Sequence, residues 1–367
     1  MTNAKVPRPI EALIVAVPET AGSALYGMID MLSTTGSLWE SLVGAGEERR
    51  LFQTHVVSID TAPFSCRNAI PIKPDVSFAD HPTADIVILP EIWLRPEESI
   101  KGRYDDLMAW LRLSYRQGAA IYSACSGSIM LAESGLLDGR EATSHWGYEE
   151  LFRTQYPRIR FRPEPNLCFA DEAGRIVTAG GITSWHDLVI HIISRHCSPG
   201  EALRVSKVYL LKWHGEGQLP YASLVRRQHH ADSAVRVCEQ WLEQNFRAPN
   251  VVARAAQASR LPDRSLKRRF KAAMGTTLIE HVQRLRIESA KQQLESGDRP
   301  IDEISADVGY EETAFFRRLF KRHTGLTPIE YRRMFAPIAE ASTPHPNRLI
   351  AKSTKLASFG VIRRSGR

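Results

Sequence analysis

Hydrophobic residues in the first half of the chain come in short, nearly continuous runs, whereas in the last third they recur every three or four residues. Short apolar runs bounded by turn residues are typical of strands buried on both faces of a parallel sheet. Stretches with helical periodicity separate these runs, and the alternation predicts an α/β doubly wound parallel sheet sandwich. The predicted strands are residues 10–17, 84–90 and 119–122, and the predicted helices are residues 23–34, 101–116 and 183–195.

Residues 300–331 carry the clearest pattern of the last third. A first short helix would present three apolar residues on one face and end at a glycine, and a second helix would carry an aromatic stripe. Two short helices joined by a tight turn form a helix-turn-helix. The residues concerned are Ile301, Ile304, Val308, Gly309, Phe316, Leu319 and Phe320.

A weaker copy of this pattern lies upstream, with its turn at residues 259–262. Its apolar positions are Val251, Ala255, Ala256, Leu266 and Phe270. Residues 276–296 join the two copies as an apolar-striped helix of about 21 residues, hence roughly 30 Å long. Since one turn of B-DNA is about 34 Å, this connector could set two helices into successive major grooves.

The second helix of each copy is basic on the face opposite its apolar stripe, where a major groove could receive it. The outward residues are Arg264, Lys267 and Arg268 in the first copy and Thr313, Arg317 and Arg318 in the second. These six residues are the candidate DNA-binding side chains.

Residues 231–335 resemble the AraC/XylS family of transcription regulators. The likeness rests on the duplicated pattern, on glycines near the helix ends and on the Thr-Pro pair at 327–328 that would open a last helix. The glycines are Gly275, Gly309 and Gly325. The resemblance implies a double helix-turn-helix DNA-binding domain whose DNA-facing positions match the six residues above. Phe315, a bulky group beside the contact positions, departs from the pattern and leaves the base preference of the second helix undefined.

Charge is unevenly distributed along the chain of 367 residues. Residues 1–230 hold 23 Lys and Arg against 26 Asp and Glu, whereas residues 231–337 hold 19 against 14 and residues 338–367 hold 6 against 1. An acidic front half joined to a basic back half fits a sensor attached to a polyanion binder. The five cysteines are widely spaced and predict reduced thiols without a metal site. No apolar run predicts a membrane span or a signal peptide, so we expect a cytoplasmic protein without a membrane partner.

Candidate chemistry in the front half centres on Cys125. It lies among small residues between a predicted strand and an apolar helix, as a sharp strand-to-helix elbow requires. At the positive end of a helix the thiol is expected to have a lowered pKa. His145 follows twenty residues later at a predicted strand end and could approach the thiol, so the two are a candidate nucleophile and base.

Residues 10–210 resemble the class I glutamine amidotransferase-like superfamily, which includes the PfpI proteases. Cys125 matches its elbow cysteine, and His145 matches the histidine that often follows. Catalytic members carry a carboxylate that hydrogen-bonds the cysteine, but Ala24 stands at that position here and Glu19 comes several residues too early. Without that acid we expect no catalysis, and the elbow is interpreted as the floor of a binding pocket.

Both halves in this order resemble the GlxA-type branch of AraC regulators. The resemblance implies an activator that senses a nitrogenous metabolite, such as arginine, glycine betaine or carnitine. A pocket at the carboxyl edge of the sheet is expected to gather the candidate ligand-binding residues Cys125, His145, Trp146, Gly181 and Trp185. The expected partners are double-stranded promoter DNA, a small-molecule effector, RNA polymerase and a second copy of the chain, with no cofactor.

The expected organisation is a ligand-sensing domain at 10–211, a linker at 212–230, the DNA-binding domain at 231–335 and a basic disordered tail at 338–367. The linker breaks helical periodicity but is apolar enough to pack on the sensor or on a partner subunit. Two alternatives remain open. One is a cysteine-dependent amidase or hydratase that uses Cys125 and His145, and the other is a redox sensor that reads oxidation of Cys125.

Overall fold

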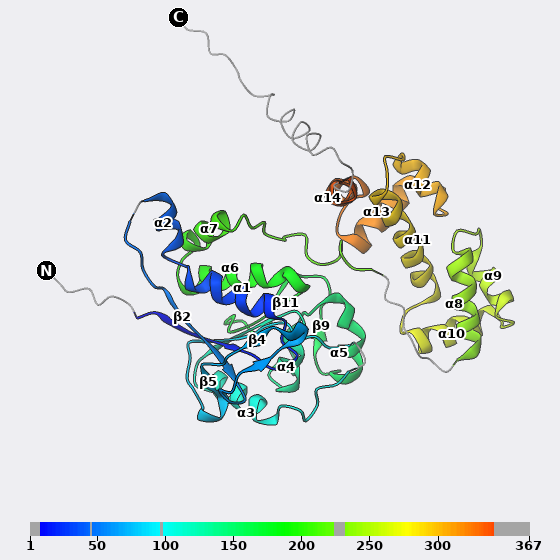
Figure 1. The fold of residues 1–367 in the computed structure, drawn as a ribbon. Helices are drawn as coiled ribbons and strands as arrows, with labels where there is room; N and C mark the ends of the chain where they lie inside the picture. Colours follow the sequence, from blue (N-terminus) through cyan, green and yellow to red (C-terminus); the bar gives the residue numbers. More distant parts are fainter. Residues whose placement is uncertain (1–7, 45, 96–97, 224–231, 341–367) are drawn as a thin grey trace, which may run out of the picture. The chain divides into compact units, whose positions relative to one another are not determined.

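The computed structural model describes residues 8–44, 46–95, 98–223 and 232–340. The chain forms two compact units, an N-terminal unit up to Ala222 and a C-terminal unit from Ser223 (Figure 1). The expected linker is therefore divided, since residues 212–222 belong to the N-terminal unit. Among the helices of the described residues, none combines the length and apolarity that a membrane crossing would need.

The N-terminal unit is built on a seven-stranded sheet in the order β10-β11-β7-β6-β1-β2-β5. All neighbouring pairs are parallel except β10 and β11, which are antiparallel at one edge. The strands are β1 (Ile10–Val15), β2 (Phe52–Ser58), β5 (Val76–Ser77), β6 (Ile86–Leu89), β7 (Ala120–Ala124), β10 (Leu167–Phe169) and β11 (Ile176–Ala179). Two small additional pairs are formed by β3 (Phe64–Ser65) with β4 (Pro71–Ile72) and by β8 (Glu141–Ala142) with β9 (Arg160–Phe161). The predicted doubly wound sheet is confirmed, with an antiparallel edge strand added.

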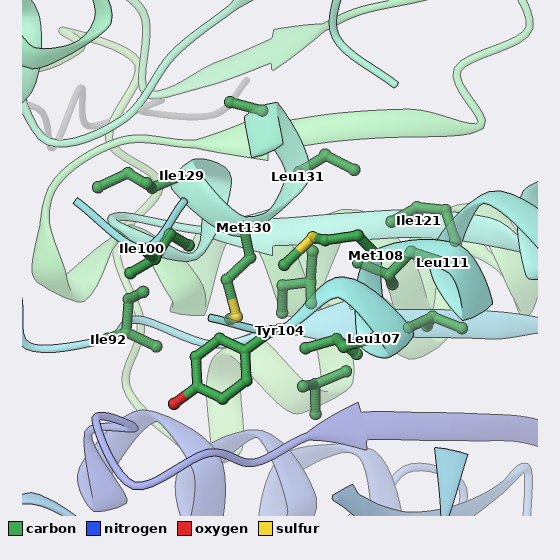
Figure 2. Packing of buried hydrophobic residues seen from close by; sticks show 14 of the residues in the cluster. Ile92, Ile100, Tyr104, Leu107, Met108, Leu111, Ile121, Ile129, Met130 and Leu131 are labelled. Carbon is green, nitrogen blue, oxygen red and sulfur yellow. The ribbon is translucent and has the colours of Figure 1, made fainter. Parts of the chain in front are cut away.

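Helices cover both faces of this sheet. Alternate residues of β1 serve different cores, because successive side chains of a strand point to opposite faces: Leu13 and Val15 pack with α3 and α4, and Ala12 and Ile14 pack with α1 and α6. Figure 2 shows part of the first core, where Met130 of α4 is directed toward Tyr104 at the start of α3. The helices are α1 (Gly22–Ser33), α2 (Leu38–Val43), α3 (Asp105–Arg116), α4 (Gly127–Glu133), α5 (Glu149–Gln155), α6 (Trp185–His196) and α7 (Pro199–Val208).

The C-terminal unit is helical and has two hydrophobic cores. The helices are α8 (Ser233–Asn245), α9 (Val251–Ala258), α10 (Asp263–Met274), α11 (Leu278–Glu295), α12 (Ile301–Asp307), α13 (Thr313–Thr324) and α14 (Pro328–Glu340). Two helix-turn-helix pairs are present, α9 with α10 and α12 with α13. The connector α11 begins at a capping box formed by Thr277 and Glu280. Its first half packs into one core through Val282, and its second half packs into the other through Ala290 and Leu294.

Two expectations for this unit need correction. The connector helix has 18 residues rather than about 21, because it begins after the Thr277 cap and ends at Glu295, so it is about 27 Å long. The expected disordered tail starts too early, because α14 continues from Pro328 to Glu340. The rest of that tail, from residue 341, lies outside the described residues.

Candidate ligand cavity and nucleic-acid interface

A cavity of about 210 Å³ lies at the carboxyl ends of the parallel strands. Its lining comes from the loops that follow β6, β7 and β11 and from the segment after β8, which is the edge where open α/β sheets bind ligands. The lining residues are Glu91, Ile92, Trp93, Cys125, Ser126, His145, Gly147, Tyr148 and Ile182. Apolar and aromatic side chains therefore surround one carboxyl, one thiol and one imidazole.

Cys125 occupies the elbow between β7 and α4. Its φ of 51° lies in the left-handed region, which a non-glycine residue adopts only under constraint, and its side chain is 4% exposed. Burial raises the pKa of the thiol to about 12, the charge of Glu91 acts in the same direction, and bonds from Ser126 and the backbone of His145 oppose them more weakly. The expected lowering of this pKa is wrong, because removal from water outweighs the short helix α4.

His145 lies beside the thiol but is not arranged as its base. Its Nδ1 accepts a hydrogen bond of 3.0 Å from the backbone N–H of Gly147. Burial lowers the pKa of the imidazole, so the neutral ring carries its proton on Nε2. Its one available lone pair is thus already used, and the ring presents a donor rather than an acceptor at Nε2.

Glu91 is the cavity residue that the sequence reasoning missed. It is 4% exposed, its Oε2 has no hydrogen-bond partner among the described residues, and burial raises the pKa of the carboxyl to about 7. Its position could have predicted this role, because Glu91 directly follows the apolar run 84–90 and so reaches the carboxyl edge of the sheet. Ala24 is buried in α1 and brings no carboxyl, whereas Glu91 brings one to the cavity from the loop after β6.

Glu19 does not serve the thiol, because its carboxylate accepts hydrogen bonds from Arg103 and from the hydroxyl of Tyr104. In Figure 2 the Tyr104 hydroxyl points away from the hydrophobic cluster.

Three of the predicted ligand-binding residues are not among those lining the cavity. The Trp146 ring packs against His145 in a tilted arrangement, with ring centroids 4.7 Å apart. Trp185 packs so tightly on α1 that a Cβ added at Gly27 would lie 2.5 Å from its ring. Gly181 lies in the turn after β11, behind His145. The structure brings Cys125 and His145 together as expected, but Trp93 and Tyr148 supply the aromatic surface.

The predicted DNA-facing residues lie on the outer faces of α10 and α13. Arg264, Lys267, Arg268, Arg317 and Arg318 are exposed, Thr313 is half-buried, and Phe315 is 40% exposed beside them. The opposite faces are buried through residues such as Phe270 and Phe320.

Two of these basic side chains form exposed ion pairs, Lys267 with Asp263 at 2.7 Å and Arg317 with Asp302 at 3.3 Å. The described residues supply no ion-pair partner for Arg264, Arg268 or Arg318. Exposed pairs contribute little to stability, so DNA could replace these carboxylates at small cost.

Arg286 of α11 links the end of α8 to the turn between α12 and α13, and sequence reasoning did not identify it. Its Nε donates to the carbonyl of Phe246 and its Nη1 to the carbonyl of Gly309, both at 2.8 Å, and its guanidinium lies 4.9 Å from the Tyr310 ring centroid. Gly309 has a φ of +92°, and a Cβ there would lie 2.8 Å from the carbonyl oxygen of Arg247, so glycine is required. One side chain therefore joins the end of α8, which packs in one core with α9 and α10, to the turn of the second pair.

Two protein families match separate parts of the chain. The DJ-1/PfpI family matches residues 35–195, and a helix-turn-helix domain family matches residues 255–334.

Curated relatives include both regulators and an enzyme. The HTH-type transcriptional regulator CdhR of Pseudomonas aeruginosa is 27% identical over 296 residues, covering 80% of this chain and 85% of the relative. The HTH-type transcriptional regulator GlxA of Rhizobium meliloti is 28% identical over 224 residues, covering 61% and 68%. Isonitrile hydratase of Pseudomonas putida is 28% identical over 170 residues, covering 46% and 68%.

Proposed function

Since the chain joins a DJ-1/PfpI domain to an AraC-type helix-turn-helix domain and is a DNA-binding transcriptional regulator, we propose that a small nitrogenous metabolite controls it as an activator. The effector is an amino acid or a quaternary amine that places its positive charge in the cavity beside Glu91. The observation that carries this proposal is the buried Glu91 carboxyl, whose Oε2 has no hydrogen-bond partner among the described residues.

The chemistry of the cavity favours a cation. A buried carboxylate is costly unless a positive charge or a hydrogen-bond donor accompanies it, and an ammonium group supplies that compensation. The rings of Trp93 and Tyr148 line the same cavity and offer π faces to the methyl groups of a quaternary amine. His145 presents its Nε2–H as a donor, which suits a carboxylate on the same ligand.

The volume of the cavity separates the candidate effectors. An apolar cavity of about 150 Å³ holds benzene, which has six non-hydrogen atoms, so 210 Å³ corresponds to about eight. Glycine betaine is of that size, whereas carnitine and arginine would extend beyond the cavity. Glycine betaine is therefore the preferred first probe.

Calorimetric titration of the full chain at pH 8 tests this proposal. We expect glycine betaine to bind, and we expect Glu91→Gln to weaken binding by about tenfold or more through the loss of a charge-assisted contact. Glu172→Gln makes the same chemical change on an exposed loop and is the matched control. Absence of binding by glycine betaine, carnitine and arginine, or equal binding in Glu91→Gln, would contradict the assignment.

For DNA recognition we propose that α10 and α13 enter successive major grooves. The basic faces support this, and the connector of about 27 Å has the length to bridge most of one DNA turn. The base-reading candidates are Arg264, Lys267, Arg268, Thr313, Arg317 and Arg318. An activator also contacts RNA polymerase, which we propose as a partner. We further propose that the protein forms a homodimer, which sedimentation would test.

Fluorescence anisotropy with promoter DNA at fixed salt tests the reading helices. Arg268→Ala or Arg317→Ala is expected to cost about 1–3 kcal/mol of specific binding if the side chain reads a base edge. Lys271→Ala, in the last turn of α10, removes the same charge away from the base-reading end and should lower affinity for all sequences alike. Unchanged promoter affinity in both Arg variants would refute the assignment.

The enzyme alternative is favoured by one observation, the strained elbow at Cys125, together with the similarity to isonitrile hydratase. Two features oppose it: the thiol pKa of about 12 leaves almost no thiolate at neutral pH, and His145 has no lone pair directed to take the proton. The high thiol pKa also argues against the redox alternative, because oxidation begins from an accessible thiolate. We therefore propose that Cys125 contacts the effector without reacting.

A further inference from the structure

The last residues of the N-terminal unit, 212–222, follow α7 and precede the C-terminal unit in the chain. We name them the latch segment. They form no helix or strand, yet Gln218 in their middle is only 3% exposed. A polar side chain on an irregular segment is seldom buried so fully unless a site accommodates it.

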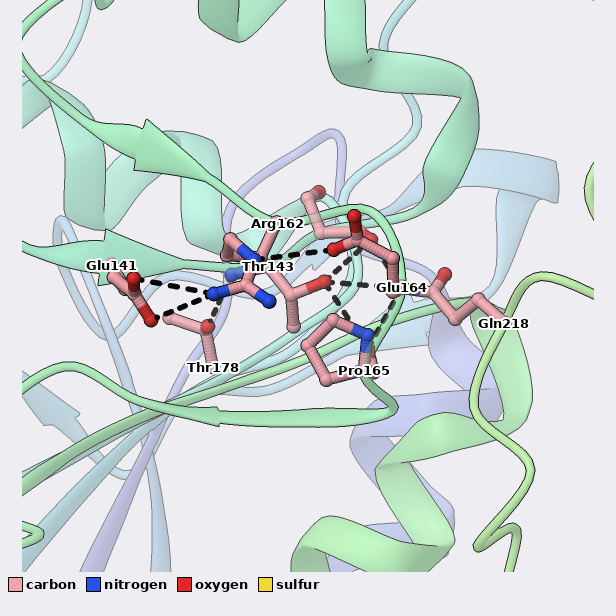
Figure 3. A network of polar contacts seen from close by, with 8 residues as sticks. Glu141, Thr143, Arg162, Glu164, Pro165, Thr178 and Gln218 are labelled. Atoms are coloured by element: carbon pink, nitrogen blue, oxygen red, sulfur yellow. Dashed lines mark hydrogen bonds and ion pairs between the residues drawn. The ribbon is translucent and has the colours of Figure 1, made fainter. Parts of the chain in front are cut away.

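Gln218 is held by hydrogen bonds from its amide and from its backbone. The Nε2 group donates to the Ser144 carbonyl at 2.9 Å and to the Thr143 hydroxyl and the Pro165 carbonyl at 3.1 Å. Its backbone N–H donates to the Glu164 carbonyl at 2.9 Å. Figure 3 shows Gln218 reaching from its own segment toward Thr143 and Pro165.

Glycines make room for this side chain. A Cβ added at Gly180 would lie 2.2 Å from Cδ of Gln218, so no other residue fits there while the amide is docked. Gly217 has a φ of +71°, and a Cβ on it would lie 2.3 Å from the Glu164 carbonyl oxygen. His214 adds a second anchor, since its Nδ1 donates to Asp187 at 2.9 Å.

The same backbone that holds Gln218 forms a wall of the effector cavity. Ser144 accepts from Gln218 through its carbonyl and donates through Oγ to the carbonyl of Cys125 at 2.8 Å. His145 comes next in the chain and lines the cavity. A Cβ added at Gly181 would lie 3.7 Å from both Gln218 Oε1 and the His145 ring. A displacement of Ser144 or His145 would therefore change both the cavity and the site that holds Gln218.

The docked state is also incomplete, because Oε1 of Gln218 is buried without a hydrogen-bond partner among the described residues. An unsatisfied buried acceptor lowers the stability of the arrangement that contains it. The latch segment thus has a well-shaped site together with a built-in cost of occupying it. That combination suits an element with two accessible states.

We propose that Gln218 latches residues 212–222 onto the N-terminal unit and that this docking is energetically coupled to occupancy of the cavity, so that the latch carries the effector signal to the DNA-binding unit. The coupling rests on the proposed function. By linkage, the effector changes the docking equilibrium by the same factor by which docking changes effector affinity.

Hydrogen exchange on the full chain tests the docking first. Gln218→Glu keeps the size of the side chain but removes the Nε2 donor and turns a carboxylate toward the Ser144 and Pro165 carbonyls. We expect the amides of Gly217 and Gln218 to exchange about tenfold faster or more in this variant. Lys212→Gln, an exposed change in the same segment, should exchange like the wild type. Equal exchange in wild type and Gln218→Glu would overturn the latch.

Coupling is tested with glycine betaine as the probe. We expect saturating glycine betaine to change exchange at residues 217–218 of the wild type, and the dissociation constant of Gln218→Glu to differ from that of the wild type. The difference in dissociation constant is largest if residues 212–222 are fully undocked in Gln218→Glu. Binding of glycine betaine with unchanged exchange and equal dissociation constants would overturn the coupling alone.

A cavity variant covers the case in which glycine betaine does not bind, which would contradict the proposed effector and not the latch. Ile92→Phe enlarges a side chain that lines the cavity on the loop after β6, where the backbone of Ile92 bonds to the Ser126 hydroxyl. None of the hydrogen bonds that hold Gln218 involves Ile92. Altered exchange at residues 217–218 in this variant is expected, and unchanged exchange would overturn the coupling whatever the effector is.

Discussion

Removal of the Glu91 charge should change the stability of the N-terminal unit in a pH-dependent way. Burial raises the pKa of this carboxyl from 4.5 to about 7, so folding takes up a proton between these pH values. Stability is therefore expected to fall as pH rises from about 4.5 to about 7 and to stay lowered above that. Each tenfold change in the ionisation equilibrium is worth about 1.4 kcal/mol, so the full penalty in the wild type is about 3 kcal/mol.

Glu91→Gln removes the ionisation but keeps the shape of the side chain. Relative to the wild type it should gain nothing near pH 4.5 and about 3 kcal/mol of unfolding free energy at pH 8. The titratable groups that share the cavity with this carboxyl are the Cys125 thiol, the Tyr148 hydroxyl and the His145 imidazole. Burial raises the pKa of the thiol and of the hydroxyl to about 12, so neither titrates in that range. Burial lowers the pKa of His145, and because this imidazole is present in both proteins its own contribution cancels in the comparison.

Urea unfolding followed by tryptophan fluorescence measures the difference, because six of the seven tryptophans precede residue 223 and report on the N-terminal unit. Glu172→Gln again controls for the lost charge. A difference between wild type and Glu91→Gln that is the same at pH 5 and pH 8 would refute the reasoning. Saturating glycine betaine should narrow the difference at pH 8 by about 1.4 kcal/mol for tenfold weaker binding by the variant, because it stabilises the chain that retains the carboxylate more.

Three further predictions concern other parts of the chain. Arg286→Ala leaves the Phe246 and Gly309 carbonyls without their donor. In fluorescence anisotropy this variant should bind a two-site operator about tenfold more weakly or worse, while binding to a single half-site is unchanged. Equal losses on both DNAs would show that Arg286 does not fix the arrangement of the two helix-turn-helix pairs. The hydrogen bond to Asp187 raises the pKa of His214, and the other charged neighbours are Glu216 and Lys212. The stability that the His214–Asp187 contact contributes should therefore be fully present below pH 6.5 and be lost as pH rises through the raised pKa. Limited proteolysis of the latch segment should accelerate over that range in wild type and not in His214→Gln. Cys125→Ser should retain DNA affinity and most glycine betaine binding, and turnover of an isonitrile or amide by the wild type that disappears in this variant would establish the enzyme instead.

Local pattern was sufficient to predict the elements and the broad class of the protein. Nearly continuous apolar runs at residues 10–17 and 84–90 predict buried strands, because a strand covered on both faces exposes few side chains to water. The paired short helices around residues 251–270 and 301–320 follow from spacing and turn residues that act within a few positions. The elbow at Cys125 was visible for the same reason, since small residues on both sides of it are a local steric requirement.

The chemistry of the sites depends on contacts between segments far apart in the sequence. Glu91 and Cys125 are brought together because β6 and β7 are neighbours in the sheet, and the loss of water there raises the thiol pKa that the helix N-terminus alone would lower. Gln218 meets Ser144 and Gly180, and Arg286 meets Phe246 and Gly309, through packing that no periodicity encodes. Sequence thus determined which elements form, because propensity and burial pattern act locally. Tertiary structure decided which side chains share a cavity, a latch or a clamp, because desolvation and hydrogen bonding depend on the neighbours that folding supplies.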